Sequence, residues 1–401
     1  MSTRLSRRQW LASGVAASSL LSFGVLAQGR APLKIGLVTS LSGPFTALGE
    51  SMRAGLQMLI AEAGGQMGGR RVELVVEDDQ GKPEEGVRKV RKLLSQDKVD
   101  VICGVISAAV ALAIRDVVND AQVPTFMANA SANALAREAA SSHIFRVTKT
   151  SWMLGHTGAL WTADHIGKAG GMTLASDYAA GREYVGDFAA TYAERGGKLG
   201  KQVWTPLGTP DFAPLLMNIA AASPSFLYSF LAGADAVRFL RQMKEFRLNG
   251  KVKLIGPGAL FDQEDVLPAA GDAALGGVST FQQSPGAPAT LAFAQAYRKA
   301  SGKWPGEAST AGYAAGQVIR AGLDAVQGDL GSAAAKTRFK ERLLSAPVTT
   351  ALGPMAFDAR NNQAILDIYV NEVRPDAEGK PFNTVLHTYK GVRDPGPKAS
   401  A

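Results

Sequence analysis

Cysteine and histidine are scarce in this sequence of 401 residues, which contains one cysteine and four histidines. A single cysteine cannot form an internal disulfide, and Cys103 lies in an apolar run where a buried, unreactive thiol is expected. The histidines, at positions 143, 156, 165 and 387, show no spacing typical of metal ligands. Neither cysteine catalysis nor a metal centre is predicted, and no cofactor is expected.

The sequence also lacks the short motifs by which many enzymes are found. It contains no H-E-x-x-H, G-x-S-x-G or phosphate loop. The first predicted strand–helix turn, SLSGPFTALG at residues 40–49, lacks the G-x-G-x-x-G spacing of dinucleotide binding. Asp78 and Asp79 follow the second predicted strand, where an acid could bind a ribose. The protein is not predicted to be an enzyme, and an exported enzyme on a Rossmann-like fold stays as the less favoured alternative.

Basic residues are in excess but are not concentrated. The formal charge is +8, and the densest basic cluster, at residues 88–92, follows Glu84 and Glu85 by one turn of a predicted helix. This spacing favours a solvated helix face. No aromatic residues alternate with the cluster, so no nucleic-acid partner is predicted.

The first 27 residues have the three parts of a secretion signal. Residues 6–11 read SRRQWL, residues 11–27 carry no charge, and the stretch ends on Ala27. The paired arginines resemble those of a twin-arginine signal. No cysteine lies near the expected cleavage point, so no lipid anchor is predicted. We expect export to the periplasm with cleavage near Ala27.

Short apolar strands alternate with helices along most of the chain, as at residues 33–38, 72–77 and 99–103. This order predicts an α/β fold with parallel sheets covered by helices on both faces. A helix is expected at residues 182–195, with Tyr184, Phe188 and Tyr192 on its core face. After Gly271 the alternation ends, which indicates that the chain returns to its first domain and then to its second.

The turn at residues 40–44 is rich in hydroxyl groups and lies between a predicted strand and a predicted helix. Free N–H groups at a helix N-terminus can hold an anion or a polar head group. An ordinary strand–helix turn with Ser and Thr as helix caps explains the same residues equally well.

Six segments, in this order and spacing, carry a resemblance to a known family. They are IGLVTSLSGPFTALG (35–49), VICGVISAA (101–109), VPTFMANASANAL (123–135), ASDYAAGRE (175–183), LIGPGALFD (254–262) and ASTAGYAAGQ (308–317). The chain resembles the periplasmic substrate-binding proteins of branched-chain amino acid ABC transporters, which are type I periplasmic binding proteins. The resemblance implies two Rossmann-like lobes joined by three crossovers, with the ligand in the cleft between them.

The expected boundaries follow from this resemblance. Residues 32–148 and 278–348 form lobe 1, residues 149–277 and 349–391 form lobe 2, and residues 392–401 form a disordered tail. The implied function is capture of a small carboxylate by cleft closure and delivery to ABC permease subunits, by a protein expected to be a monomer. A periplasmic sensor subunit that serves a signalling receptor would have the same fold and stays as an alternative.

The resemblance places a carboxylate site in the first lobe. Its members hold the ligand carboxylate with a serine after one strand and with a backbone N–H and a hydroxyl after the next. These positions correspond to Ser107 with the adjoining Ala108, and to Asn129, Ala130 and Ser131. Capping of two helices is the plainer role for the two serines. Two further positions match side chains that line the family's cleft, namely Leu48 and Tyr178.

The ammonium half of an amino-acid site departs from the family pattern. Gly258 stands where amino-acid binders have a glutamate, and Ala232 stands where they have an aromatic residue. Asp235 and Asp262 are the nearby acids that could replace the glutamate. An ammonium group needs a countercharge when it leaves water. The sequence therefore fits a carboxylate with an apolar or aromatic body at least as well as leucine, with three candidate walls at Phe45, Trp152 and Phe230.

Overall fold

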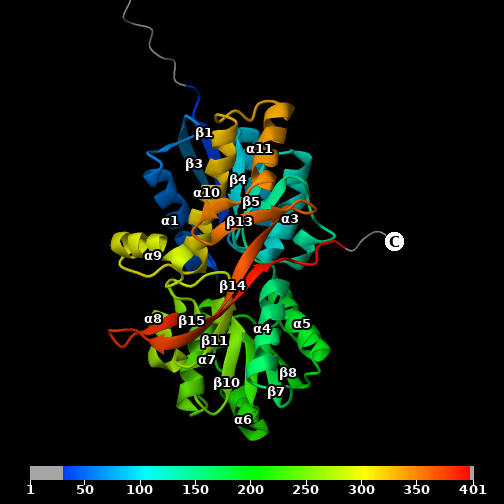
Figure 1. The fold of residues 1–401 in the computed structure, drawn as a ribbon, viewed down its shortest axis with the longest axis vertical. Helices are drawn as coiled ribbons and strands as arrows, with labels where there is room; N and C mark the ends of the chain where they lie inside the picture. Colours follow the sequence, from blue (N-terminus) through cyan, green and yellow to red (C-terminus); the bar gives the residue numbers. More distant parts are fainter. Residues whose placement is uncertain (1–29, 398–401) are drawn as a thin grey trace, which may run out of the picture.

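The computed structural model describes residues 30–397, so the predicted secretion signal lies outside the described residues. Two lobes lie one above the other, and the chain passes between them three times (Figure 1). The lobes are built on two mostly parallel sheets with helices on their faces, which confirms the predicted fold class.

The first sheet has the strand order β2-β3-β1-β4-β5-β6. Its neighbours pair in parallel, apart from β2 with β3, as expected for strands joined by helices. Its elements are β1 (Leu33–Thr39), α1 (Thr46–Glu62), β2 (Gln66–Met67), β3 (Arg70–Asp78), α2 (Pro83–Lys92), β4 (Val101–Gly104), α3 (Ala108–Asp120), β5 (Thr125–Met127) and β6 (Ile144–Arg146).

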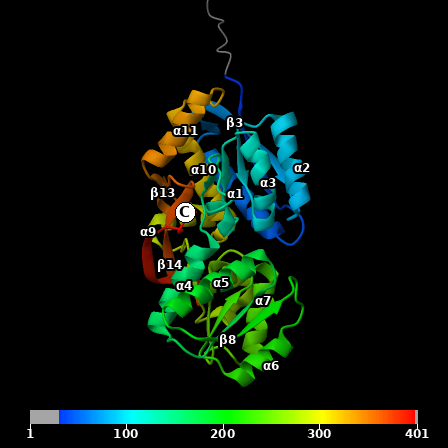
Figure 2. The same ribbon diagram turned by 90° about the vertical axis from the view of Figure 1, so that its right-hand side faces the viewer.

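The second sheet has the order β14-β11-β10-β9-β7-β8, with parallel pairing from β11 to β8. Helices α4 and α5 lie at the junction with the first lobe (Figure 2). Its elements are α4 (Ser151–His165), β7 (Gly171–Ser176), α5 (Ala179–Glu194), β8 (Leu199–Thr205), α6 (Ala213–Ala222), β9 (Phe226–Phe230), α7 (Gly233–Glu245), β10 (Lys253–Pro257), α8 (Val266–Ala270) and β11 (Val278–Phe281).

The last part of the chain joins the two lobes. Strand β14 pairs with β13 and β6 at its start and with β11 and β15 further along, so one strand belongs to both sheets. It runs along one side of the molecule beside β15 (Figure 1). The elements are α9 (Pro288–Ser301), α10 (Glu307–Ala325), α11 (Ala333–Ser345), β12 (Val348–Thr350), β13 (Gly353–Asp358), β14 (Gln363–Pro375) and β15 (Pro381–Val392).

The strand pairing differs in two places from the lobe boundaries expected from the sequence. Strand β11 pairs with β10 and β14, so residues 278–281 belong to the second sheet and not to lobe 1. Strands β12 and β13 pair on the first-lobe side, so residues 348–358 do not belong to lobe 2. These three strands lie near crossovers, where the hydrophobic periodicity of a strand is the same whichever lobe it joins.

The predicted disordered tail is wrong for residues 392–397. Asp394 is buried, and it accepts hydrogen bonds from Arg137 Nε (3.2 Å) and from Thr150 Oγ1 (2.8 Å). A buried carboxylate with these partners anchors the segment to residues on both sides of the first crossover. Residues 398–401 lie outside the described residues.

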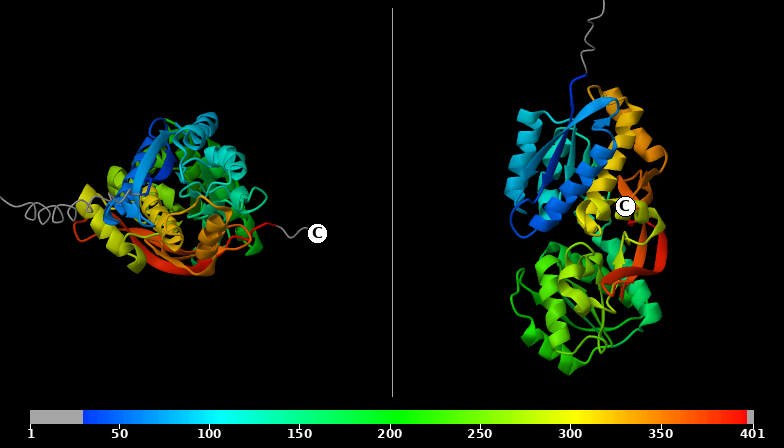
Figure 3. Two further views of the ribbon diagram at one scale, coloured as in Figure 1. Left: turned by 90° about the horizontal axis from the view of Figure 1, so that it is seen from above. Right: turned by 90° about the vertical axis from the view of Figure 1, so that its left-hand side faces the viewer.

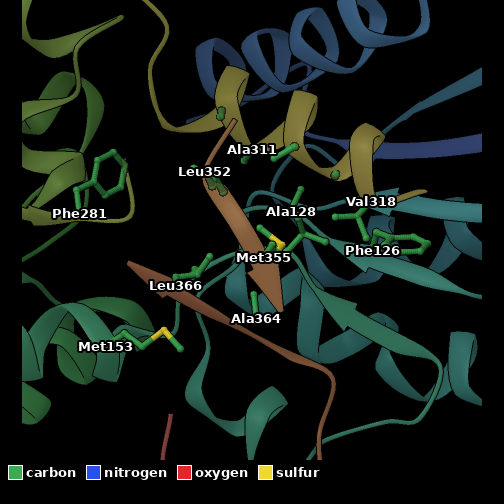
Figure 4. Packing of buried hydrophobic residues seen from close by; sticks show 14 of the residues in the cluster. Phe126, Ala128, Met153, Phe281, Ala311, Val318, Leu352, Met355, Ala364 and Leu366 are labelled. Atoms are coloured by element: carbon green, nitrogen blue, oxygen red, sulfur yellow. The ribbon is translucent and has the colours of Figure 1, made fainter. Parts of the chain in front are cut away.

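Alternate side chains of the first sheet face two different helix layers. Ile35 and Leu37 belong to the core under α1 and α10, whereas Val38 belongs to the core under α2 and α3. The right-hand view of Figure 3 shows helices on both faces of the sheet in the upper lobe. Glycine permits the close packing of α1 on α10, because a Cβ at Gly55 would lie 2.0 Å from the Ser309 carbonyl oxygen. In Figure 4, Phe126, Val318 and Met355 lie together between α10 and the strands of this core.

Cys103 is buried in β4, as predicted, and burial raises the pKa of its thiol to about 12. A thiol with so high a pKa is not a nucleophile at neutral pH.

Candidate functional site

A cavity of about 330 Å³ lies between the lobes, at the carboxyl ends of strands from both sheets. This is the edge at which parallel α/β sheets bind ligands, and the volume is in the range of about 300–1,000 Å³ typical of small-molecule sites. The structure brings seven of the predicted site residues together along it: Leu48, Ser107, Ala108, Asn129, Ser131, Tyr178 and Phe230. Phe45, a predicted wall, also lines it.

Ser107 lies between β4 and α3, and its side chain caps the helix. Its Oγ accepts a hydrogen bond from Val110 N over 3.5 Å, which is long for such a bond. The hydroxyl hydrogen is not used by this cap, because the serine accepts in it. Capping a helix and donating to a ligand are therefore compatible at this residue.

Asn129 and Ser131 follow β5 and lie on the same wall. Both are buried, and Ser131 Oγ accepts a hydrogen bond from Ser151 Oγ at 3.1 Å. Asn129 Oδ1 is buried and has no hydrogen-bond partner among the described residues. An unpaired buried amide oxygen beside a cavity marks a polar position that a ligand can satisfy.

Ala130 differs from its neighbours, because it does not line the cavity and its backbone is used inside the protein. Its N–H donates to the Val105 carbonyl (3.1 Å), and its carbonyl accepts from Arg146 Nη2 (2.9 Å). The Ala130 N–H is therefore used inside the protein, and among the three positions that the resemblance gave for this part of the site only Asn129 and Ser131 line the cavity.

Three aromatic rings of the second lobe form the opposite wall. Tyr178 precedes α5 and Phe230 ends β9, with their ring centroids 6.0 Å apart. The ring centroids of Tyr184 and Phe230 lie 4.5 Å apart, and Tyr184 also lines the cavity. Tyr184 was predicted only as a core residue, and its place one turn into α5 could have indicated that it reaches the cleft. Phe188 and Tyr192 are fully buried, as predicted for the core face of this helix.

Trp152 and Gly258 do not line the cavity. Trp152 lies in the first turn of α4, where its ring stacks on His156 with centroids 4.2 Å apart. A Cβ at Gly258 would lie 2.1 Å from Phe281 Cγ, so this position faces the core and has no room for a side chain. The residue of this loop that reaches the cavity is Ala259, one position further along the chain.

Lys149 and Glu307 line the cavity and were not predicted as site residues. They form a buried ion pair that joins the first crossover to the start of α10. In the sequence, residue 149 stands at the expected boundary between lobe 1 and lobe 2. A lysine at the junction of two lobes, where most neighbours are buried, is the signal that could have found it.

The two acids considered as replacements for the family's glutamate are used elsewhere. Asp235 pairs with Arg238 and accepts from Gly208 N (2.8 Å). Asp262 accepts from three backbone N–H groups, including that of Glu307 (2.8 Å). Asp235 lines an adjoining cavity of about 410 Å³, which shares Phe45, Leu48 and Tyr178 with the main cavity.

A polar contact joins the first lobe to α5 of the second lobe. Asn133 of the first lobe donates its backbone N–H to Glu183 (3.2 Å) and its side-chain Nδ2 to Asp187 (2.8 Å) on α5. Burial raises the pKa of Asp187 to about 6, although the Asn133 hydrogen bond lowers it. This contact ties the lobes together through two carboxylates, and burial raises the pKa of both Glu183 and Asp187.

Residues 30–397 contain no cluster of histidine, cysteine and acidic side chains that could hold a metal ion. Within the same range, every helix is too short or too polar to cross a bilayer.

The comparisons with known proteins agree with this geometry. A family model described as "Periplasmic binding protein" matches residues 32–380. The chain belongs to the periplasmic binding protein family. Like other members of this family, it has two lobes around a ligand cleft, and the resemblance to the branched-chain amino acid type is confirmed.

Three relatives of this periplasmic binding protein illustrate its place in the family. The Leu/Ile/Val-binding protein homolog 6 of Brucella melitensis is 28% identical, over 92% of this chain and 94% of the relative. An ABC transporter substrate-binding protein from Sphaerobacter thermophilus is 33% identical with a TM-score of 0.84, covering 90% of this chain and 99% of that one. A solute-binding protein of an ABC transporter from Rhodopseudomonas palustris, solved with 3,4-dihydroxybenzoic acid, is 27% identical with a TM-score of 0.84, covering 91% and 99%.

Proposed function

We propose that this periplasmic binding protein captures a small carboxylate with an aromatic or apolar body and delivers it to the permease of an ABC importer. The supporting observation is the contrast across one cavity, with hydroxyl and amide groups on one wall and aromatic rings on the other. Hydroxyl and amide donors bind a carboxylate strongly, and rings pack on a flat apolar body.

The same cavity is poorly suited to an α-ammonium group. Glu307 is the one acidic residue among the described residues that line the cavity, and it is already paired with Lys149. Asp262 is directed to backbone N–H groups, and Asp235 lines the adjoining cavity with Arg238. Burying an ammonium without a countercharge costs several kcal/mol. We therefore expect a carboxylic acid without an α-amino group to bind better than the matching amino acid.

The relatives support this choice of ligand class without deciding it. The Rhodopseudomonas palustris protein was solved with a dihydroxybenzoic acid, while the Brucella relative is named for branched-chain amino acids. Export to the periplasm is part of the proposal, and it rests on the family and on the predicted signal at residues 1–27.

Cleft closure on the ligand is the proposed step that signals loading to the permease. Three connections join the lobes, which is the arrangement in which hinge bending closes a cleft. Small-angle scattering should show a smaller radius of gyration with saturating ligand than without it.

Calorimetry with matched ligand pairs tests the proposed ligand class. The pairs are leucine with 4-methyl-2-oxopentanoate, and phenylalanine with 3-phenylpropanoate, with 3,4-dihydroxybenzoate added as a third acid. We expect the acid without an amino group to bind at least tenfold tighter in each pair. Tighter binding of both amino acids would show that the ligand class is wrong, while leaving the binding-protein function intact.

A further inference from the structure

Lys149 and Glu307 form the one ion pair that lines the main cavity within residues 30–397. Lys149 lies between β6 and α4, where the chain first passes from one lobe to the other, and Glu307 is the first residue of α10. Their side chains are 3% and 7% exposed, respectively. Two opposite charges are therefore held out of water, beside a space large enough for a ligand.

The Lys149 ammonium lies against the polar wall of the first lobe. Its Nζ donates to the Asn129 carbonyl oxygen over 3.3 Å and to Glu307, and Asn129 itself lines the cavity next to Ser131. An ammonium has three N–H donors, and within the described residues these two bonds use two of them. The unpaired Asn129 Oδ1 belongs to the same wall as the Ser107 and Ser131 hydroxyls.

More acidic than basic side chains lie behind the ion pair. The Asp262 carboxylate accepts from the backbone N–H of Glu307 at 2.8 Å, and Glu264 accepts from Gly306 N at 3.0 Å, so acids gather at the start of α10. On the other side, the Arg146 guanidinium is bound to backbone carbonyls, including that of Lys149 (3.3 Å). Burial lowers the pKa of Lys149 and Arg146 lowers it further, whereas Asp262 raises it. Among the described residues lining the cavity, Lys149 is the cation that a bound anion can approach.

We propose that the Lys149 ammonium binds the ligand carboxylate, and that Glu307 holds this ammonium in place until a carboxylate competes for it. The inference rests on the proposed function and adds to it a residue that selects the ligand. A carboxylate gains a charge-assisted hydrogen bond, whereas a neutral ligand of the same shape gains none. An α-amino acid brings its own ammonium close to Lys149, and the repulsion between the two cations disfavours it.

Two variants test the role of Lys149, with benzoate and its neutral analogue benzamide as probes in calorimetry. The titrations are made at pH 6, below the pKa of Lys149, which burial lowers to about 7. In E307Q the ammonium loses its competitor, so benzoate should bind at least tenfold tighter, while benzamide changes less than threefold. In K149Q/E307Q the net charge of the cavity is unchanged but the ammonium is absent. Benzoate should then bind at least tenfold weaker, again with benzamide within threefold.

The double variant separates direct contact from a general effect of charge. If the pair only joins the crossover to α10, benzoate and benzamide will change together in both variants, and the proposal is overturned. Equal benzoate affinity in K149Q/E307Q and in the unmodified protein also overturns it. A matched control is K253Q/E372Q, which removes the part-buried pair Lys253–Glu372 (2.9 Å) of the second lobe and should leave both affinities unchanged.

Thermal unfolding without ligand shows whether each variant is folded. If K149Q/E307Q does not fold, E307Q decides alone, and a benzoate affinity raised less than threefold overturns the proposal.

The ligands bound by the unmodified protein separate this proposal from the proposed function. Binding of leucine without any binding of benzoate or 3,4-dihydroxybenzoate overturns both the proposed function and this inference. Benzoate binding whose affinity does not change when Lys149 is replaced overturns this inference only.

Discussion

The two walls of the interlobe cavity differ in chemistry, although both are built at the carboxyl ends of parallel strands. The first-lobe wall carries Ser107, Asn129, Ser131 and the Lys149 ammonium, whereas the second-lobe wall carries three aromatic rings. Polar groups close to one another hold a charge in a defined place, and rings accept a flat body with little loss of conformational entropy. Under the proposed function, each lobe recognises a different half of one ligand.

This division also explains why neither lobe is sufficient. A carboxylate held on the polar wall alone remains exposed to water, which competes for the same hydrogen bonds. An apolar body placed on the rings alone has no fixed orientation. Under the proposed function, closure of the lobes brings both interactions to the same molecule, so we expect the affinity to depend on the closed form.

The largest effect is expected from placing an acid at two neighbouring positions of the second lobe. G258E should lower the free energy of unfolding by about 3 kcal/mol or more, because its side chain would enter the space of the Phe281 ring. A259E should cost about 1 kcal/mol, since Ala259 faces the cavity, and should raise phenylalanine affinity at least tenfold. Denaturant unfolding and calorimetry measure both effects. Equal destabilisation by the two variants would contradict the difference between these positions.

Removal of the hydroxyl groups tests the polar wall. S107A/S131A should weaken 3,4-dihydroxybenzoate binding about 100-fold, which is about 2.7 kcal/mol, because two hydrogen bonds to a charged group are lost. The matched control is S332A, since Ser332 caps α11 through a bond from Ala335 N (3.1 Å) away from the cavity. Both variants should lose about 1 kcal/mol of stability per cap. Unchanged ligand affinity in S107A/S131A would show that neither serine hydroxyl binds the carboxylate.

Replacing Tyr178 tests the aromatic wall. Y178L should weaken 3,4-dihydroxybenzoate binding about tenfold, or about 1.4 kcal/mol, because a ring–ring contact is lost. Y178F keeps the ring and should stay within twofold of the unmodified protein. The branched acid 4-methyl-2-oxopentanoate should lose less in Y178L, since a leucine packs well on an aliphatic body. Equal losses for both ligands would show that the wall does not favour rings.

A smaller effect is expected from pH at the contact between the lobes. The pKa of Asp187 is raised to about 6 by burial, above the ordinary value of 3.8. Between these values the folded protein binds more protons than the unfolded chain, so stability falls as pH rises. D187N should remove about 1 kcal/mol of this decline between pH 4 and pH 7, a figure reduced for partial exposure to solvent.

Thermal or denaturant unfolding across this pH range measures the contribution of Asp187. D272N is the matched control. In the unmodified protein the Asp272 carboxylate pairs with Lys244 on the surface of the second lobe, away from the contact between the lobes. The idea fails if D187N and D272N alter the pH profile to the same extent.

Much of the fold could be predicted from the sequence, because each strand–turn–helix unit is a local pattern. The alternation of apolar strands and helices predicts two parallel sheets, and the serines after β4 and β5 fall at the expected edge. The boundaries at the crossovers could not be predicted. Strand β14 belongs to both sheets, and its apolar side chains have the same period in either one.

The site shows the same limit at the level of single residues. Gly258 and Ala259 are neighbours in the sequence, yet one faces Phe281 and the other faces the cavity. Tyr184 has the spacing of a core residue and is buried, but it also lines the cleft. Periodicity reports which side chains leave water, and it does not report which neighbour or cavity each of them meets.

The sequence by itself determined the alternating α/β architecture, the family and the hydroxyl groups of the polar wall, because these depend on local pattern and order along the chain. Only the tertiary structure decided that Lys149 meets Glu307 across 158 positions, and that both lie beside the polar wall. Pairing between distant charges depends on how the two lobes are joined. The physical reason is that a buried charge takes its partner from space and not from sequence.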